Sequence, residues 1–139
     1  MVNSITFICA FNRTRSQVAE FLFNKYNKNR EWKAVSAGVF GGKQTKDKDL
    51  AVVLKKYGAK IGKPKTLDRH LLPKQKMIVL VADNVPKELF GGYANFDVKV
   101  LQWKVKDGWA RKGNTRVERM EEVYLDIDKR MKKFVEKFN

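Results

Sequence analysis

The hydrophobic positions of the chain change their spacing several times between its two ends. Short runs that are continuous or alternate with polar residues predict strands, and apolar residues spaced by three and four predict helices. These patterns predict strands at residues 5–9, 32–36, 77–82 and 97–101. They predict helices at residues 16–28, 47–57, 85–90 and 117–138, the second of which ends before Gly58. Strands and helices therefore alternate along the chain.

This alternation predicts an α/β fold, with a four-stranded parallel sheet and helices on both of its faces. The run 77–82 is the most continuous apolar segment, and we expect it to be a central strand buried on both faces. The apolar stripe of residues 117–138 also suits a coiled coil, but so short a run favours a helix packed on the sheet. Because no repeat or linker divides the chain, we expect one three-layer domain over residues 1–139.

Composition narrows the class of protein further. With 43% hydrophobic and 12% aromatic residues among 139, the chain is expected to bury a core and to be globular. No apolar stretch approaches the roughly eighteen residues of a membrane span, and no signal-peptide pattern is visible at the start. Cys9 is the only cysteine, which excludes an internal disulfide and agrees with a reducing, cytoplasmic setting.

The chain is strongly basic. Thirty Lys and Arg residues against fifteen Asp and Glu give a net charge of +15, so the surface attracts anions such as phosphorylated proteins and nucleic acids. The excess is spread along the chain and does not form one block. This distribution favours a generally basic surface with non-specific anion binding over a specific nucleic-acid site.

The strongest chemical signal is the position of Cys9. It ends the first predicted strand, and Arg15 and Ser16 follow it at offsets of six and seven, where a helix begins. Ligands collect at such strand ends, and the loop amides with the helix N-terminus would bind an anion and favour a thiolate nucleophile. Arg15 would add two parallel donors to phosphate oxygens, and the Ser16 hydroxyl could donate to the thiolate. The alternative is that Cys9 is a small hydrophobic residue at a strand end.

Three segments resemble the low-molecular-weight protein tyrosine phosphatases, whose superfamily includes thioredoxin-linked arsenate reductases and bacterial arginine-phosphate phosphatases. They are Cys9-Ala10-Phe11-Asn12-Arg13-Thr14-Arg15-Ser16, the helix start at residues 17–23, and Ser36-Ala37-Gly38. The family's signature is Cys, five residues, Arg, then Ser or Thr, usually with Asn in the place of Asn12. The resemblance implies a phosphocysteine on Cys9 and a loop shaped by Asn12 and Ser36. It also implies phosphate binding by Ala10, Phe11, Asn12, Arg13, Thr14 and Ser16.

The family's general acid is an aspartate on the loop between the fourth strand and the last helix. Asp107 is the only carboxylate in that part of this chain, so the resemblance implies that it protonates the leaving group and then activates water. Asp107 can equally be read as a turn residue before Gly108. Trp109 and Trp103 could wall a pocket for an aromatic leaving group, although core packing would also explain an aromatic residue there.

The chain departs from the family's pattern at three positions. Phe11 stands at the usual glycine, where it would line the mouth or alter the loop, and Gly108 stands at the usual proline of the acid loop, which would make that loop more mobile. Arg13 adds a second guanidinium, which would select multiply charged substrates or point to solvent. The single histidine, His70, has no evident partner and is expected to be structural or exposed. No metal-ligand spacing and no nucleotide-binding loop is visible, so we expect no metal and no cofactor.

These features predict a metal-independent phosphomonoesterase that acts on phosphorylated protein, with phosphotyrosine implied by the resemblance, or on a small phosphomonoester. An arsenate reductase is one alternative, but with Cys9 alone it would need an external thiol. A catalytically silent module that binds phosphate or nucleic acid is the other, and it would not need Cys9, Arg15 and Ser16 in register.

Overall fold

Four parallel strands form one sheet in the computed structural model, which describes residues 2–41 and 47–139. The strands are β1 (Asn3–Cys9), β2 (Trp32–Gly38), β3 (Met77–Val81) and β4 (Lys99–Trp103), in the order β2-β1-β3-β4. Every neighbouring pair is parallel, as the alternation of strands and helices predicted. The run predicted as a central strand is β3, between β1 and β4, and its last four residues are buried.

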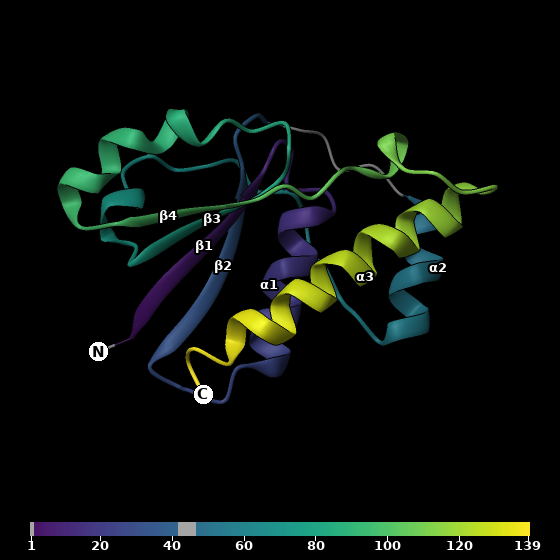
Figure 1. The fold of residues 1–139 in the computed structure, drawn as a ribbon, viewed down its shortest axis with the longest axis horizontal. Helices are drawn as coiled ribbons and strands as arrows, with labels where there is room; N and C mark the ends of the chain where they lie inside the picture. Colours follow the sequence, from purple (N-terminus) through teal and green to yellow (C-terminus); the bar gives the residue numbers. More distant parts are fainter. Residues whose placement is uncertain (1, 42–46) are drawn as a thin grey trace.

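Helices cover both faces of this sheet, as Figure 1 shows. The α-helices are α1 (Arg15–Tyr26), α2 (Lys48–Tyr57) and α3 (Arg116–Val135), and the 3₁₀ helices are η1 (Leu72–Lys74), η2 (Lys87–Phe96) and η3 (Gly108–Ala110). One face is covered by α1 and α3, and the other by η1 and η2. Helix α2 packs on α3, beside the sheet. No helix among the described residues is long and apolar enough to cross a membrane.

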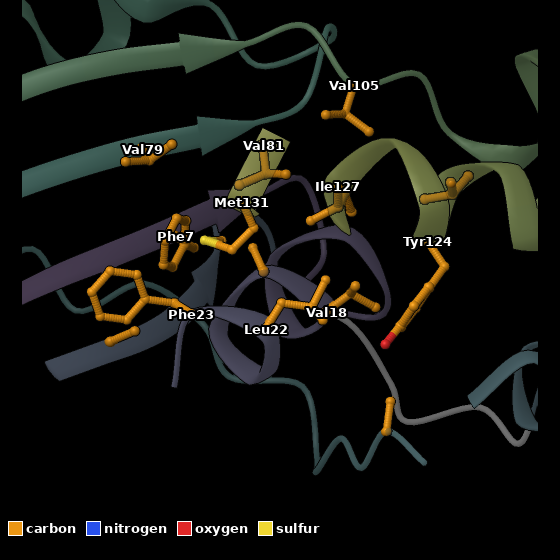
Figure 2. Packing of buried hydrophobic residues seen from close by; sticks show 14 of the residues in the cluster. Phe7, Val18, Leu22, Phe23, Val79, Val81, Val105, Tyr124, Ile127 and Met131 are labelled. Atoms are coloured by element: carbon orange, nitrogen blue, oxygen red, sulfur yellow. The ribbon is translucent and has the colours of Figure 1, made fainter. Parts of the chain in front are cut away.

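The side chains of each central strand divide between two hydrophobic clusters. In β3, Val79 and Val81 face α1 and α3, whereas Ile78 and Leu80 face η1 and η2, as a period of two requires. Figure 2 shows the larger cluster, between the sheet and the α-helices; its labelled members are Phe7, Val18, Leu22, Phe23, Val79, Val81, Val105, Tyr124, Ile127 and Met131. Because both faces of the sheet are packed, β1 and its carboxyl end are held rigidly.

The bounds of most expected elements differ from the observed ones by one or two residues, and the largest differences are in the third and last helices. The short helix expected at 85–90 is a longer 3₁₀ segment, η2, and the fourth strand begins two residues later than expected. Asp97 has a left-handed backbone with φ 62°, which separates η2 from β4. The last helix ends at Val135, although Phe138 beyond it still packs on Phe23 with ring centroids 5.5 Å apart.

Helix α2 is capped at both ends, by Asp47 before it and by Gly58 after it, and the sequence predicted the second of these. The Asp47 carboxylate accepts a hydrogen bond from the backbone N–H of Leu50 at 3.0 Å, and Gly58 ends the helix in a left-handed conformation with φ 66°. The Asp47 carboxylate also accepts hydrogen bonds from both Arg116 Nη atoms, from Nη1 at 2.5 Å and from Nη2 at 2.7 Å. This bidentate ion pair fastens the start of α2 to the start of α3.

Replacing Arg116 with glutamine is expected to lower the free energy of unfolding by about 0.5–1 kcal/mol at neutral pH, since the pair is bidentate but partly exposed. The hydrogen bond from Arg116 is the main cause that holds the pKa of Asp47 below its usual value of 3.8. A depressed folded-state pKa stabilises the fold above the unfolded value, and this contribution is lost as the pH falls through the folded value. Urea unfolding of both proteins should therefore show a difference that narrows below pH 3.8.

Lys129→Gln is the control for that comparison. Lys129 is exposed on the same helix and forms no ion pair within residues 2–41 and 47–139, so its replacement removes one positive charge without removing a partner. If the loss of unfolding free energy in Arg116→Gln stayed constant as the pH falls, the result would contradict the role of the ion pair.

Candidate active site

Cys9 lies at the carboxyl end of β1, and the chain turns from it into α1. The side chain is 3% exposed, yet its sulfur lies among polar groups. Cys9 Sγ is 3.0 Å from Ser16 Oγ, and the backbone N–H of Asn12 donates to it at 3.3 Å. A thiol that only fills space would not need two donors, so these contacts weigh against the interpretation of Cys9 as a simple core residue.

The side chain of Asn12 fixes the shape of the loop. The backbone of Asn12 is left-handed, with φ 56°, and the residue is fully buried. Its Nδ2 donates to Ser16 Oγ at 2.7 Å and to Ser36 Oγ at 3.0 Å, and its Oδ1 accepts from the N–H of Lys65 at 2.8 Å. Because Ser16 Oγ already accepts from Asn12, the hydroxyl proton of Ser16 is free to point at Cys9 Sγ.

Gln17 joins the same loop to the segment that follows α2. Its Nε2 donates to the carbonyl of Asn12 at 2.7 Å and to that of Gly62 at 3.0 Å, while its Oε1 accepts from the N–H of Gly62 at 2.7 Å. No role for Gln17 was predicted from the sequence. Its partner Gly62 is 45 residues away, so no local pattern reveals the contact.

Gly38 allows the loop to lie directly against β2. A Cβ atom at Gly38 would be 2.7 Å from the carbonyl carbon of Phe11 and 2.8 Å from the backbone nitrogen of Asn12. Both are backbone atoms that cannot rotate away, so only glycine fits at this position. Two residues of the Ser36-Ala37-Gly38 motif thus support the loop: Gly38 leaves room for its backbone, and Ser36 accepts a hydrogen bond from Asn12.

Arg15 is buried, and one edge of its guanidinium is held by the loops that follow β3 and β4. Nη1 donates to the carbonyl of Val105 at 3.0 Å and to Asp83 Oδ1 at 3.5 Å, and Nη2 donates to Asn84 Oδ1 at 3.1 Å. Within the described residues, Nε makes no hydrogen bond and Nη2 makes only the one to Asn84. Nε and Nη2 share one edge of the planar group, which can therefore bind two oxygens of one oxyanion.

The residues that hold Arg15 were not predicted from the sequence as part of the site. Asp83 and Asn84 follow β3 directly, and Val105 follows β4, so all three lie at the same edge of the sheet as Cys9. The rule that polar groups meet at the carboxyl ends of parallel strands would have found Asp83 and Asn84.

Asp107 is a turn residue and also lies at the site. As a turn residue, it accepts the N–H of Gly108 at 2.7 Å at the start of η3. It also lies at the site, because its Oδ2 is 3.9 Å from Arg15 Nη2 and its side chain is 38% exposed. Gly108 is buried, and a Cβ there would be 2.7 Å from Met120 Sδ, so the acid loop packs against α3.

Cys9, Arg15 and Asp107 line one pocket with a volume of about 530 Å³. Cys9, Phe11, Arg13, Thr14 and Arg15 line it from the loop, Asp107 and Trp109 from the start of η3, and Leu50, Ala51, Leu54, Ile61, Pro64 and Met120 form an apolar wall. Ala10, Asn12 and Ser16, which were expected to bind phosphate, are buried and do not line the pocket.

The two tryptophans proposed as pocket walls lie in different places. Trp109 lines the pocket and is 79% exposed. Trp103 follows the core-packing alternative: its ring packs on Phe7 and Phe134, with centroids 5.9 and 5.2 Å away, because β4 extends to this residue and packs it against the core. His70 is exposed and lies outside the pocket. Within the described parts of the chain, no three His, Cys, Asp or Glu side chains cluster as metal ligands.

The pocket thus combines a buried thiol, an arginine that keeps one edge available for a ligand, and a carboxylate. This arrangement suits a cysteine-based oxyanion site. The family model described as low molecular weight phosphotyrosine protein phosphatase matches residues 4–139. The chain belongs to this family, as the resemblance of its first forty residues indicated. No curated protein matches the chain significantly.

Solved structures with the same fold have several activities. An arsenate reductase from Archaeoglobus fulgidus is 29% identical, with a TM-score of 0.71 over 95% of this chain and 98% of the other. A low molecular weight protein tyrosine phosphatase from T. tengcongensis is 23% identical, with a TM-score of 0.75 over 97% and 99%. An arginine phosphatase from Geobacillus stearothermophilus is 18% identical, with a TM-score of 0.74 over 97% and 92%. The fold is thus shared by phosphatases and reductases.

Proposed function

We propose that the protein is a phosphatase that hydrolyses phosphotyrosine in proteins through a phosphocysteine on Cys9. The observation that carries the proposal is that Cys9, Arg15 and Asp107 line one pocket, although Asp107 belongs to a separate loop. A nucleophile, a bidentate oxyanion ligand and a group able to transfer protons are the parts that hydrolysis of a phosphomonoester requires.

In the first step, the Cys9 thiolate attacks phosphorus and the bond from phosphorus to the ester oxygen breaks. The free edge of Arg15 and the loop amides bind the phosphoryl oxygens, whose charge is stabilised best in the transition state. Protonated Asp107 gives its proton to the departing oxygen, so a phenol leaves in place of a phenolate. Ser16, whose Oγ lies 3.0 Å from Cys9 Sγ, donates its hydroxyl proton to the thiolate and stabilises it before attack.

In the second step, water hydrolyses the phosphocysteine. The Asp107 carboxylate accepts a proton from the water as its oxygen attacks phosphorus, and the S–P bond breaks. Inorganic phosphate forms and Cys9 returns as a thiolate. Because Asp107 regains its proton in this step, the cycle leaves the enzyme unchanged.

The shape of the pocket supports an aryl phosphate as substrate. Cys9 is 3% exposed at its base, whereas Phe11 and Trp109 at its walls are 42% and 79% exposed. A tyrosine ring is long enough to carry its phosphate down to the sulfur and can pack on these aromatic walls, whereas a phosphoserine side chain is shorter.

A panel of substrates tests this choice. One peptide would carry phosphotyrosine, phosphoserine or phosphoarginine at the same position, and arsenate would be supplied with thioredoxin or glutathione as external thiol. We expect kcat/KM for phosphotyrosine to exceed the others by about tenfold or more. Preference for phosphoarginine, or arsenate reduction without release of phosphate from any peptide, would overturn the proposal. The arsenate arm matters because the Archaeoglobus fulgidus arsenate reductase is 29% identical.

The contact of Gly38 with the loop leads to a separate prediction. Gly38→Ala is expected to lower kcat for para-nitrophenyl phosphate by about tenfold to 100-fold, because the added methyl group displaces the loop that positions Cys9. The free energy of unfolding should fall by about 1–3 kcal/mol from overpacking. Gly92→Ala is the matched control, since a Cβ at Gly92 meets nothing within 4 Å. Equal activity of the two variants would show that the contact is not needed.

A further inference from the structure

Arg13 is the one pocket-lining cation that has no anionic partner among the described residues. Three arginines line the pocket. Arg116 is bound by Asp47 and Asp49, and Arg15 by Asp83 with Asp107 nearby. Residues 42–46, which lie outside the described part, contain no carboxylate in the sequence. The guanidinium of Arg13 therefore remains available to an anion from outside the chain.

The guanidinium of Arg13 contacts an aromatic pair. Arg13 Cζ lies 5.0 Å from the centroid of the Phe11 ring, and the Phe11 ring packs on Phe40 with centroids 5.7 Å apart. The residue before Arg13 is held in place, because Asn12 is buried and both Nδ2 and Oδ1 of its side chain make hydrogen bonds. A guanidinium that is already held on an aromatic ring loses little freedom when it binds a ligand.

The chemistry of the guanidinium indicates which ligands suit Arg13. It lies over the Phe11 ring, and its N–H donors match the two oxygens of a carboxylate. Arg15, two residues further along the chain, is the arginine that we propose binds the phosphoryl group. The loop thus presents two arginines, a buried one for the phosphate and an exposed one at the mouth.

We propose that Arg13, held by Phe11, is a second anion subsite that selects phosphotyrosine beside an Asp or Glu residue in the peptide. The net charge of +15 agrees with an acidic peptide as partner. This subsite rests on the proposed phosphotyrosine phosphatase activity, and it gives the exposed guanidinium of Arg13 a role in choosing the substrate.

The test uses three phosphotyrosyl peptides that differ only in one residue beside the phosphotyrosine: Glu, Gln or Lys. In the parent protein, kcat/KM should be about 3–10-fold higher for the Glu peptide than for the Gln peptide, and lowest for the Lys peptide. The preference should lie mostly in KM, because the contact is made before and during the chemical step. It should weaken as the salt concentration rises.

Variants assign this preference to Arg13. Arg13→Gln should bring the ratio between Glu and Gln peptides to about one, Arg13→Lys should retain part of it, and Arg13→Glu should favour the Lys peptide. Lys129→Gln, which lowers the net charge by the same amount on an exposed part of α3, should keep the parent ratio.

The outcomes separate the two proposals. If the parent hydrolyses the Glu and Gln peptides equally well, or if Arg13→Gln keeps the parent ratio, the subsite is wrong while the phosphatase activity stands. If the parent hydrolyses none of the peptides, the proposed function fails and the subsite fails with it.

Discussion

Cys9→Ser is expected to lower the turnover of para-nitrophenyl phosphate by about 10⁴-fold or more, the scale seen when a catalytic nucleophile is removed. A serine hydroxyl is a much weaker nucleophile than a thiolate, and the site offers no adjacent base to activate it among the described residues. Steady-state kinetics of the parent and the variant measure the loss. Activity within about tenfold of the parent would contradict the mechanism.

Binding and stability measurements separate lost chemistry from lost structure in this variant. The free edge of Arg15 and the loop amides remain, so inorganic phosphate should still bind with an affinity within about tenfold of the parent. Urea unfolding should show a folded protein, because serine retains a polar atom that faces Ser16 and the N–H of Asn12. Loss of both activity and phosphate binding would indicate a disrupted loop.

Asp107→Asn has the second largest expected effect, a loss of about 10²–10³-fold in kcat for phosphotyrosine. Asparagine has the same shape and can still accept the hydrogen bond from Gly108 N–H, so the turn should persist. It cannot, however, give a proton to the leaving phenolate. The loss should be smaller for para-nitrophenyl phosphate, whose leaving group departs more readily without protonation.

The dependence on the leaving group distinguishes an acid from a structural residue. Rates measured over a series of substituted phenyl phosphates should depend more steeply on leaving-group basicity in Asp107→Asn than in the parent. Asp83→Asn is a matched control, since Asp83 is also a carboxylate near Arg15 but does not line the pocket. Its slope should remain that of the parent. Equal slopes in Asp107→Asn and the parent would rule out proton donation by Asp107.

The parts of the fold with a regular local pattern could be predicted from the sequence. The period-three-and-four stripe of α3, the continuous apolar run of β3 and the Gly58 cap of α2 each depend on neighbours within one element. The 3₁₀ segment η2 could not be predicted in the same way, because it is shaped by packing against β4 and η1. The two alternatives for Trp103 could not be separated for a related reason, since the end of β4 determines whether this residue packs on the core.

The candidate site shows the same division. Cys9, Arg15 and Ser16 are close in sequence, and a loop between a strand and a helix brings them together by itself. The contacts that hold this loop are between distant segments: Gln17 with Gly62 across 45 residues, and Arg15 with Val105 across 90. Such contacts depend on the order of strands in the sheet, which the pattern of one chain does not specify.

The solitary cysteine separates this chain from one way of using the shared fold. Reduction of arsenate within a single chain needs further cysteines to resolve the adduct, and Cys9 is the only one in this sequence. Hydrolysis needs only water and a proton acceptor, and Asp107, the acceptor that we propose, lines the pocket. The single cysteine therefore favours the proposed hydrolysis over arsenate reduction, which would need an external thiol.

The central claim is that a phosphoryl group passes through Cys9. The most direct measurement is to mix the Asp107→Asn variant with para-nitrophenyl phosphate, quench in acid within milliseconds, and map any added phosphoryl group by mass spectrometry. Since this leaving group departs readily without protonation while the variant hydrolyses the intermediate slowly, one phosphoryl group should appear on the peptide that contains Cys9, together with a burst of para-nitrophenolate. Release of both products without a phosphoryl group on Cys9, or with one on another residue, would contradict the account.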